Sequence, residues 1–199
     1  AGVADRVFTA FPDVLKKAQW VGNPLRSAFT RQAAPSERFA GRTGPLRLLV
    51  AGGSLGAQAL NDIVPRALAL IPAADRPLVT HQSGATQIDA LRANYQAAGV
   101  QAELTPFIDD TASAFAAADI IVCRAGASTV TEIAAVGAAA VFVPFPFAVD
   151  DHQTTNARFL VNAGGGWLVQ QSDLTPEGLA KMLLNSERTA LVDIAEKAK

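Results

Sequence analysis

Residues 116–137 constrain the fold of this chain more than any other part of its sequence. Positions 120–123 are apolar and mostly β-branched, which is typical of a strand that helices cover on both faces. A tight loop at 124–128 follows, and then a helix that ends at Gly137. This order places free backbone N–H groups and the positive end of a helix dipole at the carboxyl end of a strand, an arrangement suited to binding phosphate.

The same order of strand, turn and helix repeats from Leu46 onwards. Hydrophobic patterning predicts further strands at 46–51, 78–81, 100–104, 139–143 and 166–169, and helices at about 57–70, 86–98, 109–118, 152–163 and from Pro176. Strands that alternate with helices of about ten to fifteen residues indicate a parallel sheet with helices on both faces. We therefore expect an α/β protein with a Rossmann-like, doubly wound parallel sheet and right-handed crossovers.

Residues 1–45 do not follow this pattern. Positions 6–10 and 19–22 are compatible with short strands, but prolines and glycines interrupt the rest. We therefore expect no separate domain in this segment and place the main domain at 46–199.

Composition excludes several classes of function. The chain is 50% hydrophobic and 18% charged, as in globular proteins, and its net charge of −1 without a basic run argues against nucleic-acid binding. The chain has a single cysteine, Cys123, which excludes a disulfide framework and a thiolate metal cluster. This cysteine lies in the predicted buried strand. The longest apolar run, 138–149, contains two prolines and is too short to cross a bilayer.

Four polar or glycine-rich segments follow predicted strands, at 52–56, 81–84, 124–129 and 150–156. Because ligands of such sheets bind beyond the carboxyl ends of the strands, we expect these segments to form one site. The sequence GGSLG at 52–56 matches neither the dinucleotide fingerprint nor a Walker A loop. It is interpreted either as a phosphate loop or as a tight turn that requires glycine dihedrals.

Thr129 and Glu132 allow two interpretations. They form a capping box, in which each side chain satisfies a free backbone N–H, or Glu132 accepts hydrogen bonds from two vicinal hydroxyls while Thr129 binds phosphate. Arg124 favours the second interpretation, because a guanidinium just beyond a buried strand must pair with an acid or face an anion.

The segment after residue 150 suggests a sugar site. Gln153 and Asn156 are three residues apart, share a helix face, and have amides that donate and accept hydrogen bonds. The two histidines, His81 and His152, lack metal-ligand spacing, and no Asp-x-Asp pair is present, so we expect neither a metal site nor a cofactor.

Six segments, in order along nearly the whole chain, resemble the carboxyl-terminal half of the MurG family of bacterial glycosyltransferases: VGNPLR, GGSLGAQALN, HQSG, TPFIDD, ADIIVCRAGASTVTEIAAVG and VFVPFPFAVDDHQTTNA. Members of this family transfer N-acetylglucosamine from UDP-N-acetylglucosamine to lipid I, a lipid-linked muramyl-pentapeptide, and so make lipid II in peptidoglycan synthesis. The resemblance implies an inverting, metal-independent hexosyltransferase with two doubly wound domains, the GT-B arrangement. Residues 46–199 would bind the UDP-sugar, and residues 1–45 would join them to the edge of a missing amino-terminal domain.

Carried over position by position, the resemblance also implies roles for single residues. Glu132 would bind the ribose diol, and Phe107 and Ile108 would frame the uracil. The remaining positions would surround the diphosphate or the sugar: Ser54, Ala127, Ser128 and Thr129 at the diphosphate with Arg26 and Arg124 nearby, and Gln153 and Asn156 at the N-acetylglucosamine hydroxyls.

The resemblance covers only part of the family pattern. The glycine-rich acceptor loop and its histidine are absent from this sequence, and the general base is expected in that other half. We therefore expect no catalytic residue in this chain and little or no turnover by it alone. The patch that contacts the cytoplasmic side of the inner membrane, as a peripheral protein, is also expected there. The first residue is not Met, which indicates a fragment or a processed product.

Two other functions fit the same fold. A UDP-N-acetylglucosamine 2-epimerase shares the architecture and the nucleotide, but it needs acidic residues around the sugar where this chain has amides. A non-catalytic module that binds UDP-sugars would use the same site without transfer.

Overall fold

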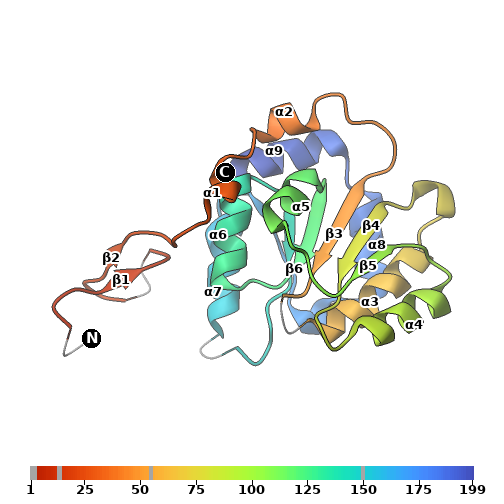
Figure 1. Ribbon diagram of the computed structural model, residues 1–199, viewed down its shortest axis with the longest axis horizontal. Coiled ribbons are helices and arrows are strands. Elements are labelled where there is room, and N and C mark those ends of the chain that lie inside the picture. The colour runs from red at the N-terminus through yellow and green to blue at the C-terminus, as the bar shows by residue number, and fades with distance from the viewer. Residues whose placement is uncertain (1–3, 13–14, 54–55, 149–150) are drawn as a thin grey trace.

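The computed structural model describes residues 4–12, 15–53, 56–148 and 151–199. Its centre is a parallel six-stranded sheet in the order β5-β4-β3-β6-β7-β8 (Figure 1). The strands are β3 (Arg47–Ala51), β4 (Leu78–Gln82), β5 (Glu103–Thr105), β6 (Ile120–Cys123), β7 (Ala140–Phe142) and β8 (Gly166–Leu168). Strand order reverses between β3 and β6, so the predicted doubly wound sheet is confirmed.

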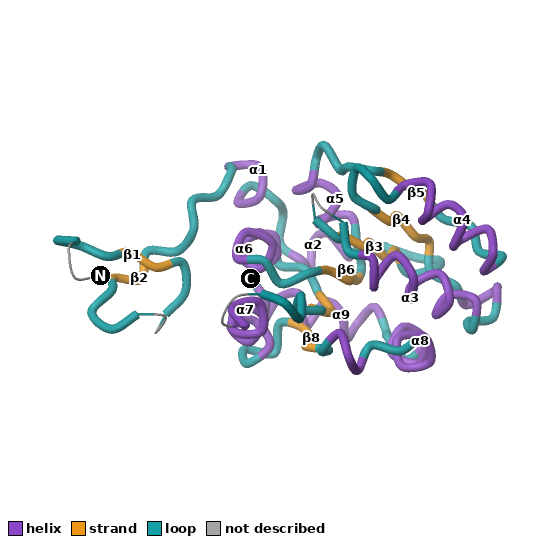
Figure 2. Tube along the Cα trace, turned by 90° about the horizontal axis from the view of Figure 1, so that it is seen from below, coloured by secondary structure: helices purple, strands orange, loops and turns teal. Residues whose placement is uncertain are grey.

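Helices cover both faces of the sheet (Figures 1 and 2). They are α3 (Gln58–Ala69), α4 (Ile88–Ala98), α5 (Thr111–Ala117), α6 (Ala127–Val136), α7 (His152–Val161), α8 (Pro176–Leu184) and α9 (Arg188–Ala198), with 3-10 turns η1 (Ala73–Asp75) and η3 (Gln171–Asp173). Helices α4 and α6 each end at a glycine with positive φ, Gly99 and Gly137, where other side chains would be strained.

Alternate residues of the central strands pack into two separate cores, because successive side chains of a strand point to opposite faces. Val50 and Val122 pack in one core with apolar residues of α3, α4 and α8. Leu49 and Ile121 pack in the other with residues of α5, α6 and α7. This two-sided burial explains the continuous apolar run at 120–123.

The predicted strands and helices from residue 46 onwards are confirmed, with bounds that differ by no more than three residues. One prediction needs correction, since the final helix is two helices, α8 and α9. Helix α8 ends at Asn185, and Arg188 then directs its guanidinium to Asp119 at 3.0 Å. The two residues of this ion pair are 69 positions apart, so no local sequence pattern marks it.

Residues 24–45 pack onto the sheet domain, although they contain several helix-breaking residues. They form α1 (Ser27–Thr30) and α2 (Pro35–Phe39), and proline at the first position of α2 is compatible with a helix start. Phe29 is fully buried in one core, and Phe39 is buried in the other. Arg42 forms an ion pair with the buried Asp119 at 2.7 Å.

The first described residues form a small parallel pair, β1 (Phe8–Thr9) and β2 (Gln19–Trp20), which projects from the body of the protein (Figure 1). It contacts α7 through edge-to-face packing of Phe11 and Trp20 on Phe159. No helix in the described ranges is long and apolar enough to span a membrane.

Candidate functional site

A cavity of about 230 Å³ lies at the carboxyl ends of β3, β4 and β6, where the strand order reverses. Ligands of doubly wound sheets bind at this position. The residues that line it come from five separate segments: Ala51, Gly53, Gln82, Phe107, Ile108, Thr111, Phe115, Arg124, Thr129 and Glu132. Five of the residues predicted from the sequence, Phe107, Ile108, Arg124, Thr129 and Glu132, are therefore brought together.

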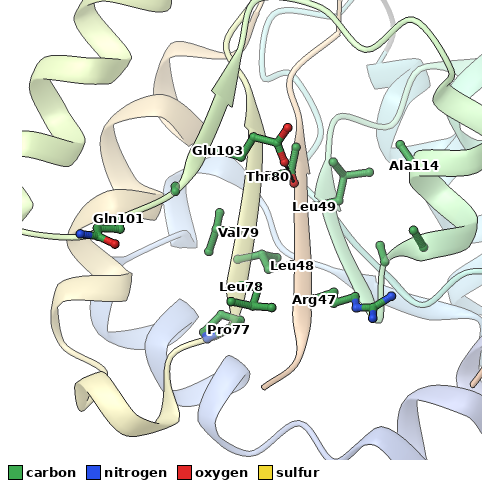
Figure 3. A pocket seen from close by; sticks show the side chains of 13 residues that line it. Arg47, Leu48, Leu49, Pro77, Leu78, Val79, Thr80, Gln101, Glu103 and Ala114 are labelled. Atoms are coloured by element: carbon green, nitrogen blue, oxygen red, sulfur yellow. Dashed lines mark hydrogen bonds between the residues drawn. The ribbon is translucent and has the colours of Figure 1, made fainter. Parts of the chain in front are cut away.

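A larger groove of about 620 Å³ lies elsewhere, along the first residues of β3, β4 and β5 (Figure 3). Leucine and valine side chains such as Leu48 and Val79 line it, and its main polar contact is the 3.1 Å hydrogen bond from Thr80 to Glu103. It contains none of the loops at the carboxyl ends of the strands. We therefore assign the candidate site to the smaller cavity.

The first turn of α6 borders this cavity through Thr129. Its N-cap is Gly126, which makes no side-chain capping bond. The helix begins at Ala127, so Thr129 lies in the first turn and Glu132 beyond it. The capping-box interpretation is therefore wrong, because that motif requires the threonine at the N-cap itself. The first N–H groups of α6 and its dipole favour an anion at this position.

Glu132 is partly buried in the wall of the cavity. Burial raises the pKa of its carboxyl group, and the positive charge of Arg26 lowers it in part. The guanidinium of Arg26 lies over the ring of Phe29, 5.0 Å from its centroid. Within the described residues, Glu132 has no salt bridge.

Arg124 crosses from β6 to the loop that follows β7. Its guanidinium donates to the carbonyl oxygens of Val143 and Pro144 at 3.2 and 3.1 Å, and to Oε1 of Gln171 at 2.7 Å. It also lies over the ring of Phe145. Among the described residues Arg124 forms no salt bridge, so of the two expected arrangements, an acidic partner or an anion, the second remains open beside the cavity. Burial lowers the pKa of Arg124.

The two predicted sugar-binding amides differ in their surroundings. Oε1 of Gln153 accepts hydrogen bonds from the backbone N–H groups of Phe145 at 2.9 Å and Ala125 at 3.3 Å. Asn156 is buried, and its Nδ2 donates to the carbonyl oxygen of Ala125 at 3.1 Å. Both amides therefore hold the loop after β6, and Gln153 is the more exposed of the two.

Other predicted site residues lie outside the cavity lining. Ala127 and Ser128 form the first residues of α6, next to Thr129. Ser54 falls outside the described residues, as does the first residue of the segment at 150–156. Across the described ranges, no group of three or more His, Cys, Asp or Glu residues is arranged to hold a metal ion.

Sequence reasoning missed Gln82, whose side-chain amide connects two walls of the cavity. Its Oε1 accepts from the N–H of Gly53 at 3.1 Å, and its Nε2 donates to the carbonyl oxygens of Gly53 at 2.9 Å and Pro106 at 3.0 Å. The sequence places the segment at 81–84 at the predicted site without giving Gln82 a role. The available signal was an amide side chain at the end of a strand that adjoins a glycine-rich turn.

Comparison with known proteins gives a consistent result. Residues 47–199 match the model of the glycosyltransferase family 28 C-terminal domain. Over all 199 residues the chain is 79% identical to a Paracidovorax citrulli protein and 60% identical to a Cupriavidus metallidurans protein, covering 56% of each. Both are named UDP-N-acetylglucosamine--N-acetylmuramyl-(pentapeptide) pyrophosphoryl-undecaprenol N-acetylglucosamine transferase. The chain thus spans about half the length of these curated relatives.

Solved structures show the same likeness. The crystal structure of Acinetobacter baumannii MurG aligns with a TM-score of 0.83 and 40% identity, over 99% of this chain and 56% of that chain. The C-terminal CMP-Kdo binding domain of Acinetobacter baumannii WaaA aligns with a TM-score of 0.57 at 10% identity, over 87% of this chain and 98% of that chain, which supports the fold alone. The resemblance to the MurG family that the sequence indicated is confirmed, as is the GT-B type of fold.

Proposed function

This chain belongs to the glycosyltransferase family 28 C-terminal domain family, and from that membership we propose that it is the donor-binding half of an N-acetylglucosaminyltransferase of peptidoglycan synthesis. The names of its relatives support the choice of UDP-N-acetylglucosamine as donor and of a lipid-linked muramyl-pentapeptide as acceptor. The observation that carries the proposal is the cavity at the reversal of strand order. It combines a helix terminus without a side-chain cap, a partly buried carboxylate and an arginine that forms no salt bridge within the described ranges.

Each part of a UDP group has a matching partner around this cavity. The diphosphate would lie between the amino terminus of α6, where the N-cap Gly126 carries no side chain, and Gly53, which also lines the cavity. Glu132 would accept hydrogen bonds from the ribose hydroxyls, and Phe107 and Ile108 would contact the uracil. Gln153 would meet the sugar from the start of α7.

The reaction itself requires stabilisation of the departing diphosphate. A helix dipole contributes up to about 2 kcal/mol to anion binding in partly buried sites. The positive charges of Arg124 and Arg26 would add to it, so the chain can stabilise the leaving group through its own residues without a metal. We propose an inverting transfer in which the general base comes from the other half of the protein, so that this chain alone gives little or no product.

The place of action follows from the acceptor. Because the relatives are named for a pyrophosphoryl-undecaprenol substrate, we propose that the whole protein works as a peripheral protein at the cytoplasmic side of the bacterial inner membrane. The membrane contact is assigned to the part of the protein outside this chain.

Titration calorimetry with UDP and UDP-N-acetylglucosamine, without divalent metal, tests the donor site. Both ligands should bind, and Glu132→Ala should weaken both by about tenfold or more, because a hydrogen bond to a charged group contributes about 1.5–3 kcal/mol. The exposed Glu177 of α8 provides a matched control, since Glu177→Ala removes the same charge away from the cavity. Loss of affinity with Thr129→Ala but none with Glu132→Ala would contradict the assigned role of Glu132.

A further inference from the structure

We propose that Gln82 is a positioning residue that braces the two walls of the nucleotide cavity against each other, so that the uracil and diphosphate ends of a UDP ligand bind in concert. This inference rests on the proposed UDP-sugar site and adds to it a residue whose side chain acts through the backbone of its neighbours. It is drawn from the three hydrogen bonds of one amide.

The first wall is the glycine-rich turn after β3. Gln82 pairs with both backbone groups of Gly53, accepting from its N–H and donating to its carbonyl oxygen. Gly53 has a φ of +84°, a conformation that side chains other than glycine rarely adopt. The same carbonyl oxygen accepts from the N–H of Gly56 at 2.9 Å. Gln82 therefore helps to fix the orientation of both the N–H and the carbonyl group of Gly53.

The second wall is the loop after β5. The other proton of the Gln82 amide is donated to the carbonyl oxygen of Pro106, directly before Phe107 and Ile108 in the cavity wall. One amide thus joins the glycine-rich turn to the segment proposed to hold uracil. Both amide protons of Gln82 are donated, and the residue is 5% exposed, so these hydrogen bonds are shielded from water.

The strand beneath this brace is itself held by a buried polar network. Nε2 of His81 lies 3.0 Å from Oδ1 of Asn61, and Nδ1 lies 3.0 Å from the hydroxyl of Tyr95. Asn61 also donates to the carbonyl oxygen of Ser83 at 3.2 Å. Residues on both sides of Gln82 are therefore fixed to α3 and α4, which leaves the amide little freedom to turn away.

Other side chains cannot replace this amide. Glutamate has the same length, but its carboxylate can keep only the bond from the Gly53 N–H and would repel the two carbonyl oxygens. Alanine removes all three hydrogen bonds. A pre-organised site loses less conformational entropy when a ligand binds. Loss of the brace should therefore lower affinity most for a ligand that contacts both walls at once.

The experiment compares three probes on the full chain: UDP, which spans both walls, and uridine and pyrophosphate, which each contact one. Gln82→Ala and Gln82→Glu should weaken UDP by about tenfold and each single-wall probe by less than about threefold. Affinities are measured by calorimetry or competition at a temperature below the onset of unfolding of each variant. Gln96→Ala, on the exposed face of α4, is the matched control and should bind all three probes as the wild type does.

The outcomes separate this inference from the proposed function. Absence of UDP binding by the wild type would overturn the proposed function itself. If the wild type binds UDP and the Gln82 variants lose affinity equally for all three probes, or lose none for UDP, the brace is excluded and the donor site stands. A loss specific to UDP in Gln82→Glu, where side-chain volume is kept, supports the brace over a packing role.

Discussion

Oε1 of Gln153 accepts a hydrogen bond from the backbone N–H of Phe145 at 2.9 Å, and this contact fixes which end of the amide faces the site. A second bond to Oε1, from the N–H of Ala125, reinforces the orientation. The remaining polar atom, Nε2, can only donate. Gln153 would therefore recognise an acceptor oxygen of the sugar.

Gln153→Glu tests this orientation. The carboxylate keeps both accepted bonds but has no proton to donate, so the ratio of UDP-N-acetylglucosamine affinity to UDP affinity should fall about tenfold, the value of one hydrogen bond of about 1.5 kcal/mol. Calorimetry with the two ligands measures the ratio. Gln101→Glu, which adds the same charge at an exposed position, should leave it unchanged. An unchanged ratio in Gln153→Glu would show that Nε2 does not contact the sugar.

Arg124→Lys should disturb the site although it keeps the charge. The guanidinium donates to three acceptors in a fork that a single ammonium group cannot reproduce. We expect UDP affinity to fall about tenfold and unfolding free energy to fall by about 1–2 kcal/mol, since carbonyl oxygens lose their donors. Calorimetry and urea unfolding measure the two effects. Arg158→Lys, on the exposed side of α7, should change neither; wild-type behaviour of Arg124→Lys would mean that charge alone suffices.

Buried His81 should make folding stability depend on pH. Burial lowers its pKa to about 3, well below the usual value near 6.5, so the folded state keeps the ring neutral while the unfolded state binds a proton. The stabilisation is present above pH 6.5 and is lost as pH falls, by about 2 kcal/mol between pH 7.5 and 5. Urea unfolding of the wild type and of His81→Gln at both pH values isolates this contribution. The variant should lose about 2 kcal/mol less, and a parallel decline in both proteins would argue against it.

The Asp119 ion pairs should matter far more to stability than the exposed pair on α4. Asp119 has a fully buried side chain and contacts Arg42 at 2.7 Å. Arg42→Ala should cost about 3 kcal/mol, because it leaves a buried carboxylate with one arginine fewer. Arg92, paired with Asp89 at 2.9 Å on the surface, is the control, and Arg92→Ala should cost less than about 0.5 kcal/mol. Thermal or urea unfolding measures both, and similar costs would refute the ranking.

Local sequence patterns predicted most of the sheet domain, because the residues within each strand and helix mark its type and its ends. The strand at 120–123 is entirely apolar, and the helix after it ends at Gly137, a residue suited to a left-handed C-cap. The convergence of Gly53, Gln82 and Thr129 on one cavity follows from the rule that carboxyl ends of parallel strands meet at one edge, whereas the placement of Phe107 there was implied by the family resemblance.

The features that sequence did not predict depend on distant backbone groups. Arg124 finds its acceptors 19, 20 and 47 residues away, and two of these are carbonyl oxygens, which every residue possesses and no pattern marks. Gln82 acts in the same way on Gly53 and Pro106. The capping-box interpretation of Thr129 failed for a local reason, since α6 starts at Ala127.

The burial of Phe29 and Phe39 bears on where the protein can be cut. The family match begins at residue 47, yet these two rings fill the opposite cores of the sheet, and Arg42 neutralises Asp119 from the same upstream segment. A truncation at residue 46 would leave a cavity in the core on each side of the sheet. It would also remove Arg42, one of the two arginines that pair with the buried Asp119. Phe11 packs in the same core as Phe29, so we expect the cooperative folding unit to reach upstream of both rings and the border of the family match to lie inside that unit.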